Sequence, residues 1–327
     1  MASACSLLWM ESEEGGAEEC LVVKRAAETP DLRVLRCEYR FYTEVVRCWE
    51  QPDAAELLGG GLQVPRAVAA SWGPEDWEAE GFLLALERLA PPAWRRAEPE
   101  AGCSSEQAAA AAGALGRLHA AFAVEDRLAA HPWLPLTPLA LGEAEQLQSQ
   151  YTGCLARSYS SLQGLLPPAA LGACVAMCSG GTFAAALGRL ARPPLTLLHG
   201  DYRTENLRFA APGASPGVAA FDWGMVCRGR GALDLGYFLA LGMPPEARKE
   251  REEGLVQDYI VAFGSGSAEA LWAELRDSIL CLLGKLVLAY ADFFGPQRAQ
   301  DMLSRSLRWA GAAAEDWDAG RALHEAA

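Results

Sequence analysis

The stretch LLHGDYRTEN, from Leu197 to Asn206, places polar side chains directly after an apolar run. His199 and Asp201 follow the run LTLL, and Asn206 stands immediately before the apolar LRF. A second loop has the same form, since Asp222 comes directly after the run VAAF. Short apolar runs bounded by polar loops are typical of buried strands, which hold the side chains at their ends in fixed positions. The sequence therefore predicts one site built from these two loops.

The residue types in these loops indicate a particular chemistry. Mg²⁺ binds one or two protein carboxylates, and phosphate oxygens and water complete its coordination. In this arrangement Asn206 and Asp222 would hold Mg²⁺, while Asp201 would accept a proton from a substrate hydroxyl. The two loops therefore predict a Mg²⁺ site together with a carboxylate that accepts a proton.

Length and composition define the broad class of the protein. The 327 residues, 51% of them hydrophobic, are enough for two domains or one large two-lobed unit with an ample core. The 42 acidic and 28 basic residues give a net charge of −14. This balance opposes a broad surface for nucleic acid or anionic lipid, and it favours a cationic ligand or a basic partner.

The cysteines and the hydropathy profile bear on the compartment. The ten cysteines are scattered, and acidic residues follow the first ten residues, where a secretory signal would need an apolar core. We therefore expect reduced thiols in the cytoplasm. No apolar run approaches the eighteen residues of a membrane-spanning helix, because Lys285 and Asp292 interrupt LLGKLVLAYADFF. The sequence predicts a soluble protein.

The pattern of the chain changes near residue 90. The preceding part is predicted to form strands around one helix, which begins at Asp31 and lies between it and Glu50. A polar linker, APPAWRRAEPEAGCSS, follows, and from Ser105 the pattern is mainly helical. The predicted fold is α+β, with an amino-terminal sheet lobe over 1–89 and a larger helical lobe over 90–327. Helical segments are expected at about 105–124, 138–164, 168–190, 245–264, 267–294 and 297–311.

Three motifs carry a family resemblance. HGDYRTEN, FDWG and ALDLGYFLA resemble the signature of the aminoglycoside phosphotransferase and choline kinase superfamily, which is related in fold to the protein kinases. The spacing of the first motif matches the protein-kinase catalytic loop H-R-D-x-x-x-x-N, with Gly200 in place of the arginine. The resemblance implies a two-lobed protein-kinase-like fold that binds ATP in the cleft between the lobes.

The resemblance also assigns roles to individual residues. It makes Asp201 the catalytic base, and it assigns Mg²⁺ to the same asparagine and aspartate that the residue types indicate. His199 would brace the loop, and Asp234 would hold it through backbone hydrogen bonds. Arg203 occupies the position of a protein-kinase lysine that contacts the transferred phosphate, so it would neutralise charge there.

A kinase also needs a strand lysine that grips the nucleotide phosphates and pairs with a glutamate of the next helix. Lys24 ends the strand CLVVK, and Glu38 lies in the following RCEYRFYTEV. Glu44 is a competing partner, but Glu38 fits the family pattern before Phe-Tyr. This phrase, with WLP after LHAAF, resembles more narrowly the ecdysteroid-kinase-like (CHK kinase-like) branch.

The run FLLALERLAPP resembles the hinge between the kinase lobes. Glu87, Arg88 and Leu89 stand where this branch usually carries Glu-Asp-Leu. The backbone from Leu86 to Arg88 would therefore bind the edge of the adenine.

The amino terminus departs from the family pattern. Kinases of this fold begin with a hairpin whose loop covers the ATP phosphates, whereas this chain starts with MASACSLLW, inside the expected second strand. Gly15-Gly16 would form a later hairpin turn. The sequence thus predicts an ATP-dependent phosphotransferase that acts on a hydroxyl of a small molecule. The alternative is a pseudokinase or nucleotide-binding module without efficient turnover, because the phosphate loop is absent.

Some polar residues have a structural interpretation. Cys174 and Cys178 share a helix face but have no matching ligand pair, which favours core packing over a zinc site. His119 lies on an apolar helix face and is predicted to be a hydrogen-bonded core residue. The acidic EDWDAG, 315–320, would either attract a cationic substrate through Trp317 or form a solvated terminal helix.

Overall fold

The computed structural model describes residues 3–11, 18–26, 31–46, 61–72, 81–98, 100–136, 144–214, 217–291 and 295–324. Its internal contacts divide the chain into two units. The first combines Met1–Ala97 with Glu205–Val226, and the second combines Glu98–Thr204 with Cys227–Ala327. The sequence-based division at residue 89 assigned 205–226 to the helical part instead. Strand pairing explains the difference, because this segment forms a sheet with strands of the first unit.

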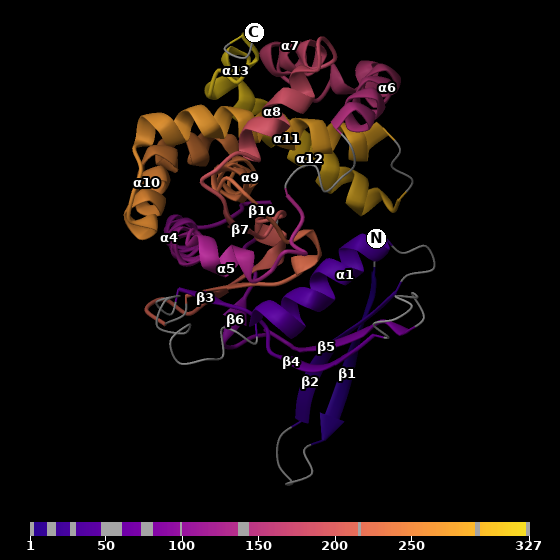
Figure 1. Ribbon diagram of the computed structural model, residues 1–327, viewed down its shortest axis with the longest axis vertical. Helices are drawn as coiled ribbons and strands as arrows, with labels where there is room; N and C mark the ends of the chain where they lie inside the picture. The colour runs from indigo at the N-terminus through magenta and orange to yellow at the C-terminus, as the bar shows by residue number, and fades with distance from the viewer. Residues whose placement is uncertain are drawn as a thin grey trace. The chain divides into compact units, whose positions relative to one another are not determined.

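The main sheet of the first unit is antiparallel. Its order is β1 (Ser3–Glu11), β2 (Glu18–Ala26), β5 (Leu83–Glu87), β4 (Ala67–Ser71). In Figure 1 the helix α1 (Leu32–Arg40) lies across this sheet. Leu21 and Val23 of β2 pack with Ala85 of β5, while Lys24 points to the opposite face, as strand alternation requires. The predicted turn at Gly15-Gly16 lies outside the described residues.

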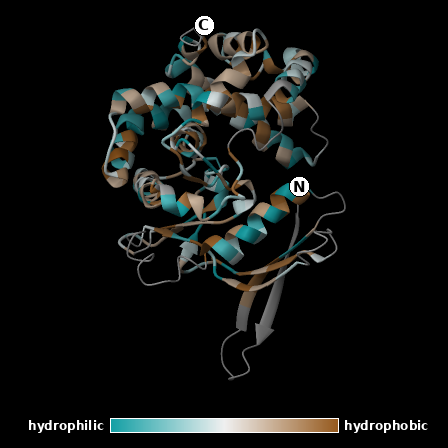
Figure 2. Ribbon diagram, in the orientation of Figure 1, coloured by the Kyte–Doolittle hydropathy of each residue, from teal (hydrophilic) through white to brown (hydrophobic). Residues whose placement is uncertain are grey.

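Helix α1 begins at the predicted residue, because the Asp31 side chain accepts a hydrogen bond from the Arg33 amide and so caps the helix. The helix continues into a π-helical turn, η1 (Phe41–Val45). Figure 2 shows hydrophilic and hydrophobic residues side by side along α1, as expected for a helix with one buried face. The last predicted helical residues, 47–50, lie outside the described part.

A second sheet in the first unit has the order β3 (Leu62–Gln63), β9 (Val218–Ala220), β8 (Leu207–Ala210), β6 (Trp94–Arg95). β8 and β9 form an antiparallel hairpin from the predicted runs NLRF and GVAAF. Strand β6 lies within the stretch that the sequence predicts to be a linker. Its two residues pair with Phe209 and Ala210 of β8, so this stretch contributes an edge strand.

The second unit is mainly helical. It contains a two-stranded sheet of β7 (Thr196–Leu198) and β10 (Cys227–Gly229). Its helices are α4 (Ser105–Phe122), α5 (Glu125–Ala129), α6 (Ala144–Leu162), α7 (Pro168–Ala176), α8 (Thr182–Leu190), α9 (Ala232–Gly242), α10 (Pro245–Phe263), α11 (Ala268–Ala291), α12 (Gln297–Asp316) and α13 (Arg321–His324). The single helix expected over 168–190 is two helices, because Gly180 and Gly181 adopt φ of +58° and +71°, which break the helix. None of the helices in the described part combines the length and hydropathy needed to cross a bilayer.

Helix α9 is buried along its whole length and packs closely on α11. At Gly236 an added Cβ would lie 2.3 Å from Ser278 Oγ, so only glycine allows this approach. The Ser278 hydroxyl donates to the Leu233 carbonyl at 3.0 Å across the same contact. This packing fixes the position of α11 against the helix that carries Asp234.

Candidate active site

Lys24 lies between two carboxylates in the first unit. Its Nζ is 2.6 Å from Glu38 Oε1 and 2.8 Å from Asp222 Oδ1. The side chains of Lys24 and Glu38 are 7% and 2% exposed, whereas that of Asp222 is 52% exposed. Burial favours the neutral amine, but the charges of Glu38 and Asp222 outweigh it and raise the pKa of Lys24. The lysine is therefore a fixed positive charge beside an accessible carboxylate.

The packing of α1 on the segment after β9 explains why these groups meet. The Trp223 amide donates to the Glu38 carboxylate, and the Trp223 ring stacks on Phe41 with ring centroids 4.0 Å apart. At the next residue, an added Cβ on Gly224 would lie 2.5 Å from Val34 Cγ1. The motif FDWG thus packs an aromatic ring and a glycine against α1, and this packing brings Asp222 into contact with Lys24.

Asn206 and Asp222 stand at the same end of the β8–β9 hairpin. The Phe221 amide donates to the Asn206 carbonyl at 3.1 Å, which continues the register of the pair Leu207 and Ala220. Asp222 adopts a left-handed conformation, with φ +66° and ψ +60°. Such a conformation is strained for a residue other than glycine and clusters at functional sites. Asp222 thus combines this strained backbone conformation with a side chain that is half exposed.

These two residues fit a hard divalent cation. A carboxylate and an amide oxygen are ligands that Mg²⁺ accepts, and the exposure of Asp222 leaves its carboxylate accessible. Across the described ranges, no group of three or more His, Cys, Asp or Glu side chains could hold a metal ion. Phosphate oxygens and water are the groups that commonly complete the coordination of Mg²⁺ at such a site.

The competing glutamate has a different partner. Glu44 Oε1 lies 2.6 Å from Arg40 Nε, one helical turn away. In the structure Glu38, and not Glu44, contacts Lys24. The two glutamates differ in partner because Glu38 lies on α1 itself, whereas Glu44 lies farther along, within the π-helical turn.

The expected hinge residues lie at the end of β5. Leu86 is buried within the strand and pairs with Val22 on one side and Ala67 on the other. The Glu87 amide donates to the Arg66 carbonyl at 2.9 Å, so it already has a partner. Arg88 follows the strand. Of the three residues, only Arg88 therefore has its backbone beyond the sheet.

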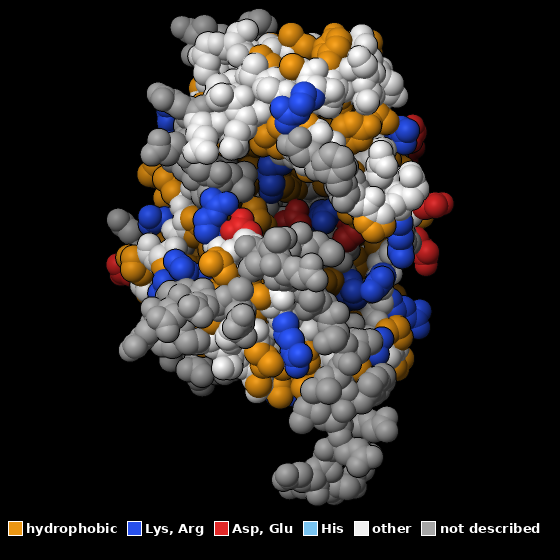
Figure 3. Space-filling model, turned by 90° about the vertical axis from the view of Figure 1, so that its right-hand side faces the viewer, with side chains coloured by type: hydrophobic (Ala, Val, Ile, Leu, Met, Phe, Trp, Pro, Cys, Tyr) orange, Lys and Arg blue, Asp and Glu red, His pale blue; other side chains and the backbone are white. Residues whose placement is uncertain are grey.

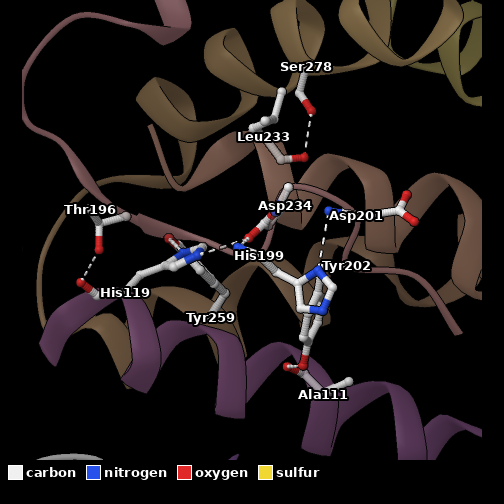
Figure 4. A network of polar contacts seen from close by, with 11 residues as sticks. Ala111, His119, Thr196, His199, Asp201, Tyr202, Leu233, Asp234, Tyr259 and Ser278 are labelled. Atoms are coloured by element: carbon white, nitrogen blue, oxygen red, sulfur yellow. Dashed lines mark hydrogen bonds and ion pairs between the residues drawn. The ribbon is translucent and has the colours of Figure 1, made fainter. Parts of the chain in front are cut away.

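The loop of the second unit that carries Asp201 is held by a buried aspartate. Asp234, in the first turn of α9, is fully buried and accepts the amides of His199 at 2.6 Å and Gly200 at 2.9 Å. Figure 4 shows this network, in which His119 also reaches the Asp234 carboxylate, with 3.5 Å between Nε2 and Oδ2. The aspartate predicted to hold the loop is thus bonded to its backbone.

Asp201 itself points away from this network (Figure 4). Its amide donates to His199 Nδ1 at 3.3 Å, and its Oδ2 accepts a hydrogen bond from Arg203 Nε at 3.1 Å. The Asp201 and Arg203 side chains are 28% and 25% exposed. A partly exposed carboxylate on a loop fixed by buried groups is suited to act on a bound molecule.

The sequence identified His199 and Asp234 as supports of this loop, but it did not identify the contacts that surround them. The Tyr202 hydroxyl donates to the Ala111 carbonyl at 3.1 Å, and His119 Nδ1 lies 2.8 Å from the Tyr259 hydroxyl. His119 is a hydrogen-bonded core residue, as predicted, but its contact with Asp234 was not foreseen. The separation along the chain hides these contacts, because no local pattern links α4, α9 and α10.

The structure therefore contains two groups of the predicted residues. The first unit brings together Lys24, Glu38 and Asp222, with Asn206 at the same hairpin end as Asp222. The second unit brings together His199, Asp201, Arg203 and Asp234.

Solved structures share the fold at low sequence identity. A choline/ethanolamine kinase family protein from Mesorhizobium loti is 16% identical, with a TM-score of 0.54 over 98% of this chain and 92% of that chain. A microcompartment-associated aminopropanol kinase is 13% identical, with a TM-score of 0.55 over 98% and 94%. The amicoumacin kinase hAmiN, in complex with AMP-PNP, Ca²⁺ and Ami, is 14% identical, with a TM-score of 0.52 over 94% and 88%. These similarities establish the α+β, protein-kinase-like fold.

A search of curated proteins found no match. The model of the phosphotransferase enzyme family APH, however, matches residues 14–277. This range covers most of the chain and contains both groups of candidate site residues. The chain therefore belongs to the APH phosphotransferase enzyme family.

Proposed function

We propose that the protein is an ATP-dependent phosphotransferase that moves the γ-phosphoryl group to a hydroxyl of a small molecule. The observation that carries this proposal is the buried Lys24, held between Glu38 and Asp222. A lysine fixed by a helix glutamate beside a metal-binding aspartate is the arrangement that grips nucleotide phosphates in kinases. Amicoumacin kinase, which shares the fold, binds AMP-PNP and Ca²⁺, and this supports a nucleotide and a divalent cation here.

The proposed reaction uses both groups of residues. Asp201 accepts the proton as the O–H bond of the acceptor breaks, and the acceptor oxygen forms a bond to the γ-phosphorus. The bond between the γ-phosphorus and the bridging oxygen breaks, and ADP leaves with that electron pair. Lys24 and Arg203 supply positive charge to the phosphate oxygens, so that catalysis is mostly positioning and charge neutralisation.

Mg²⁺ would be held by Asn206 and Asp222. When bound, it would neutralise charge on the phosphate oxygens of the nucleotide. The Asp222 side chain is half exposed and its carboxylate also accepts from Lys24, so one residue links the lysine to the metal site.

We propose a small amino alcohol as the acceptor class. Two proteins that share the fold are named for choline or ethanolamine and for aminopropanol, each of which combines a hydroxyl with an amino or quaternary ammonium group. The net charge of −14 is consistent with a cationic acceptor. The phrase RCEYRFYTEV remains the basis for a narrower placement in the ecdysteroid-kinase-like branch.

Calorimetry of ATP binding, with and without Mg²⁺, tests the proposal. We expect Mg²⁺-dependent binding to the wild-type protein and its loss in Asp222→Ala. The matched control is Asp258→Ala, which removes an exposed aspartate of α10 and should bind like the wild type. Wild-type protein that does not bind ATP would contradict the proposal. Binding without phosphorylation of any amino alcohol would instead support a pseudokinase.

A further inference from the structure

Lys285 contacts the backbone of the catalytic loop. Its Nζ donates to the Gly200 carbonyl at 3.2 Å and lies 4.8 Å from the centroid of the Tyr237 ring. In the sequence this lysine is only a charge that interrupts an apolar helix. In the structure it reaches the peptide unit directly before Asp201.

The packing of α11 explains how Lys285 reaches the loop. Ser278 and Lys285 are separated by seven residues, which is about two helical turns, so they lie on the same face of α11. Ser278 contacts α9 at Leu233, where Gly236 allows the close approach. The face of α11 that packs on α9 therefore also carries the ammonium group toward the loop.

Two side chains thus hold the backbone at Gly200, one through its N–H group and the other through its carbonyl. Asp234 accepts the amides of His199 and Gly200, while Lys285 donates to the Gly200 carbonyl. Gly200 adopts a left-handed conformation, with φ +78°. Glycine reaches this conformation without strain, but it also has more backbone freedom than other residues. A contact with the carbonyl restricts the peptide that leads into Asp201.

The surroundings of Tyr237 place this contact close to the proposed base. Burial is the main cause that raises the pKa of Tyr237, and the negative charges of neighbouring groups, Asp201 and Asp234 among them, add to it. Tyr237 and Asp234 are three residues apart on α9 and share a face. The Lys285 ammonium over this ring therefore belongs to the same cluster as the loop.

We propose that Lys285 is a positioning residue, whose hydrogen bond to the Gly200 carbonyl orients Asp201. Its kinetic consequence rests on the proposed phosphotransferase function. A misplaced base lowers the rate of the chemical step without changing the grip on the nucleotide, because Lys24 and Asp222 make that grip from the first unit.

The first readout does not depend on activity. Hydrogen exchange measured by mass spectrometry on the full chain follows the amides of His199 and Gly200 in Lys285→Met, which has a side chain of similar length but no donor. We expect exchange about 10-fold faster than in the wild type. Lys285→Arg, which keeps a cationic donor, should stay near the wild-type rate. Lys249→Met is the matched control, because Lys249 is an exposed lysine of α10 paired with Asp316.

The second readout is Mg²⁺-dependent ATP hydrolysis, with water as the acceptor. We expect kcat about 10- to 100-fold lower in Lys285→Met, an unchanged KM for ATP, and recovery in Lys285→Arg. The proposal would be overturned if the amides of Lys285→Met exchanged at the wild-type rate. It would also be overturned if kcat fell equally in Lys285→Met and Lys285→Arg. A wild-type protein that does not hydrolyse or transfer phosphate would count against the proposed function, whereas the exchange comparison would still decide the role of Lys285.

Discussion

Lys24 is the residue whose burial is hardest to explain by stability alone. Replacing a buried ion pair by apolar residues is often neutral or stabilising, because desolvation of the charges offsets their attraction. Here the Lys24 side chain is 7% exposed and its ammonium group has two carboxylate partners, one of which belongs to a residue with a left-handed backbone. Two energetically costly features at one place favour a functional explanation, and the proposed binding of phosphate at Lys24 and of metal at Asp222 supplies one.

The role of Asp201 predicts a separation of binding from chemistry. Asp201→Asn keeps the size of the side chain but removes the proton acceptor. We expect phosphate transfer to fall about 10²- to 10⁴-fold while the Kd for Mg²⁺-ATP stays near the wild-type value. Calorimetry and a transfer assay on the same preparations check this. Unchanged turnover in the variant would contradict the assignment of Asp201 as the base.

At the scale of elements, the loop that carries Asp201 depends on the close approach of α9 and α11. Asp234 and Tyr237 on α9 and Lys285 on α11 all contact the loop or one another. Gly236 makes this possible, because any side chain there would collide with Ser278. The loop is therefore positioned by helix packing as well as by its own sequence.

Gly236→Ala tests this packing. The new methyl group would lie 2.3 Å from Ser278 Oγ, so the helices must separate. We expect about 1–3 kcal/mol lower free energy of unfolding, measured by urea denaturation. The double variant Gly236→Ala, Ser278→Gly removes the obstructing hydroxymethyl and should recover part of the loss. Additive losses in the double variant would show that the two residues do not collide.

At the scale of the molecule, the protein carries a net charge of −14. On the face shown in Figure 3, Lys and Arg side chains form separate groups among hydrophobic and uncharged surface, rather than one continuous field. In the acidic segment EDWDAG, one carboxylate already has cationic partners within the protein. Asp316 pairs with the fully buried Arg248 and with Lys249, and Trp317 lies 5.6 Å from the Arg248 guanidinium. These contacts hold α10 against the end of α12.

The Asp316 cluster predicts a pH-dependent part of stability. Burial acts to raise the pKa of Asp316, but hydrogen bonds from Lys249 and Arg248 outweigh it and lower the pKa below 3.8. The folded state therefore binds this proton more weakly than the unfolded state. The stabilisation from this carboxylate is fully present above pH 3.8, and it is lost as the pH falls through the pKa that Asp316 has in the folded state.

Asp316→Asn should accordingly lower the free energy of unfolding by about 1 kcal/mol at pH 7. The difference from the wild type should shrink as the pH falls below 3.8, because the unfolded chain then takes up a proton that the folded wild type binds more weakly. Urea denaturation at pH 7, 5, 4 and 3 measures it. A difference that stays the same at every pH would contradict this account.

The sequence determined the features that depend on local pattern. Apolar runs beside polar loops located β7, β8 and β9, and helical periodicity located most helices of the second unit. The spacing within HGDYRTEN and FDWG indicated the loops and their family. These features were predictable because strand alternation, helix period and motif spacing are properties of neighbouring residues.

Only the tertiary structure decided which distant groups meet. It joined 205–226 to the first unit and brought Lys285 to a carbonyl 85 positions away. It also paired Lys24 with Asp222 across 198 positions. Periodicity tells which face of an element is buried but not which element covers that face. Those partners depend on close packing, such as the approach of α9 and α11 at Gly236, which no local pattern encodes.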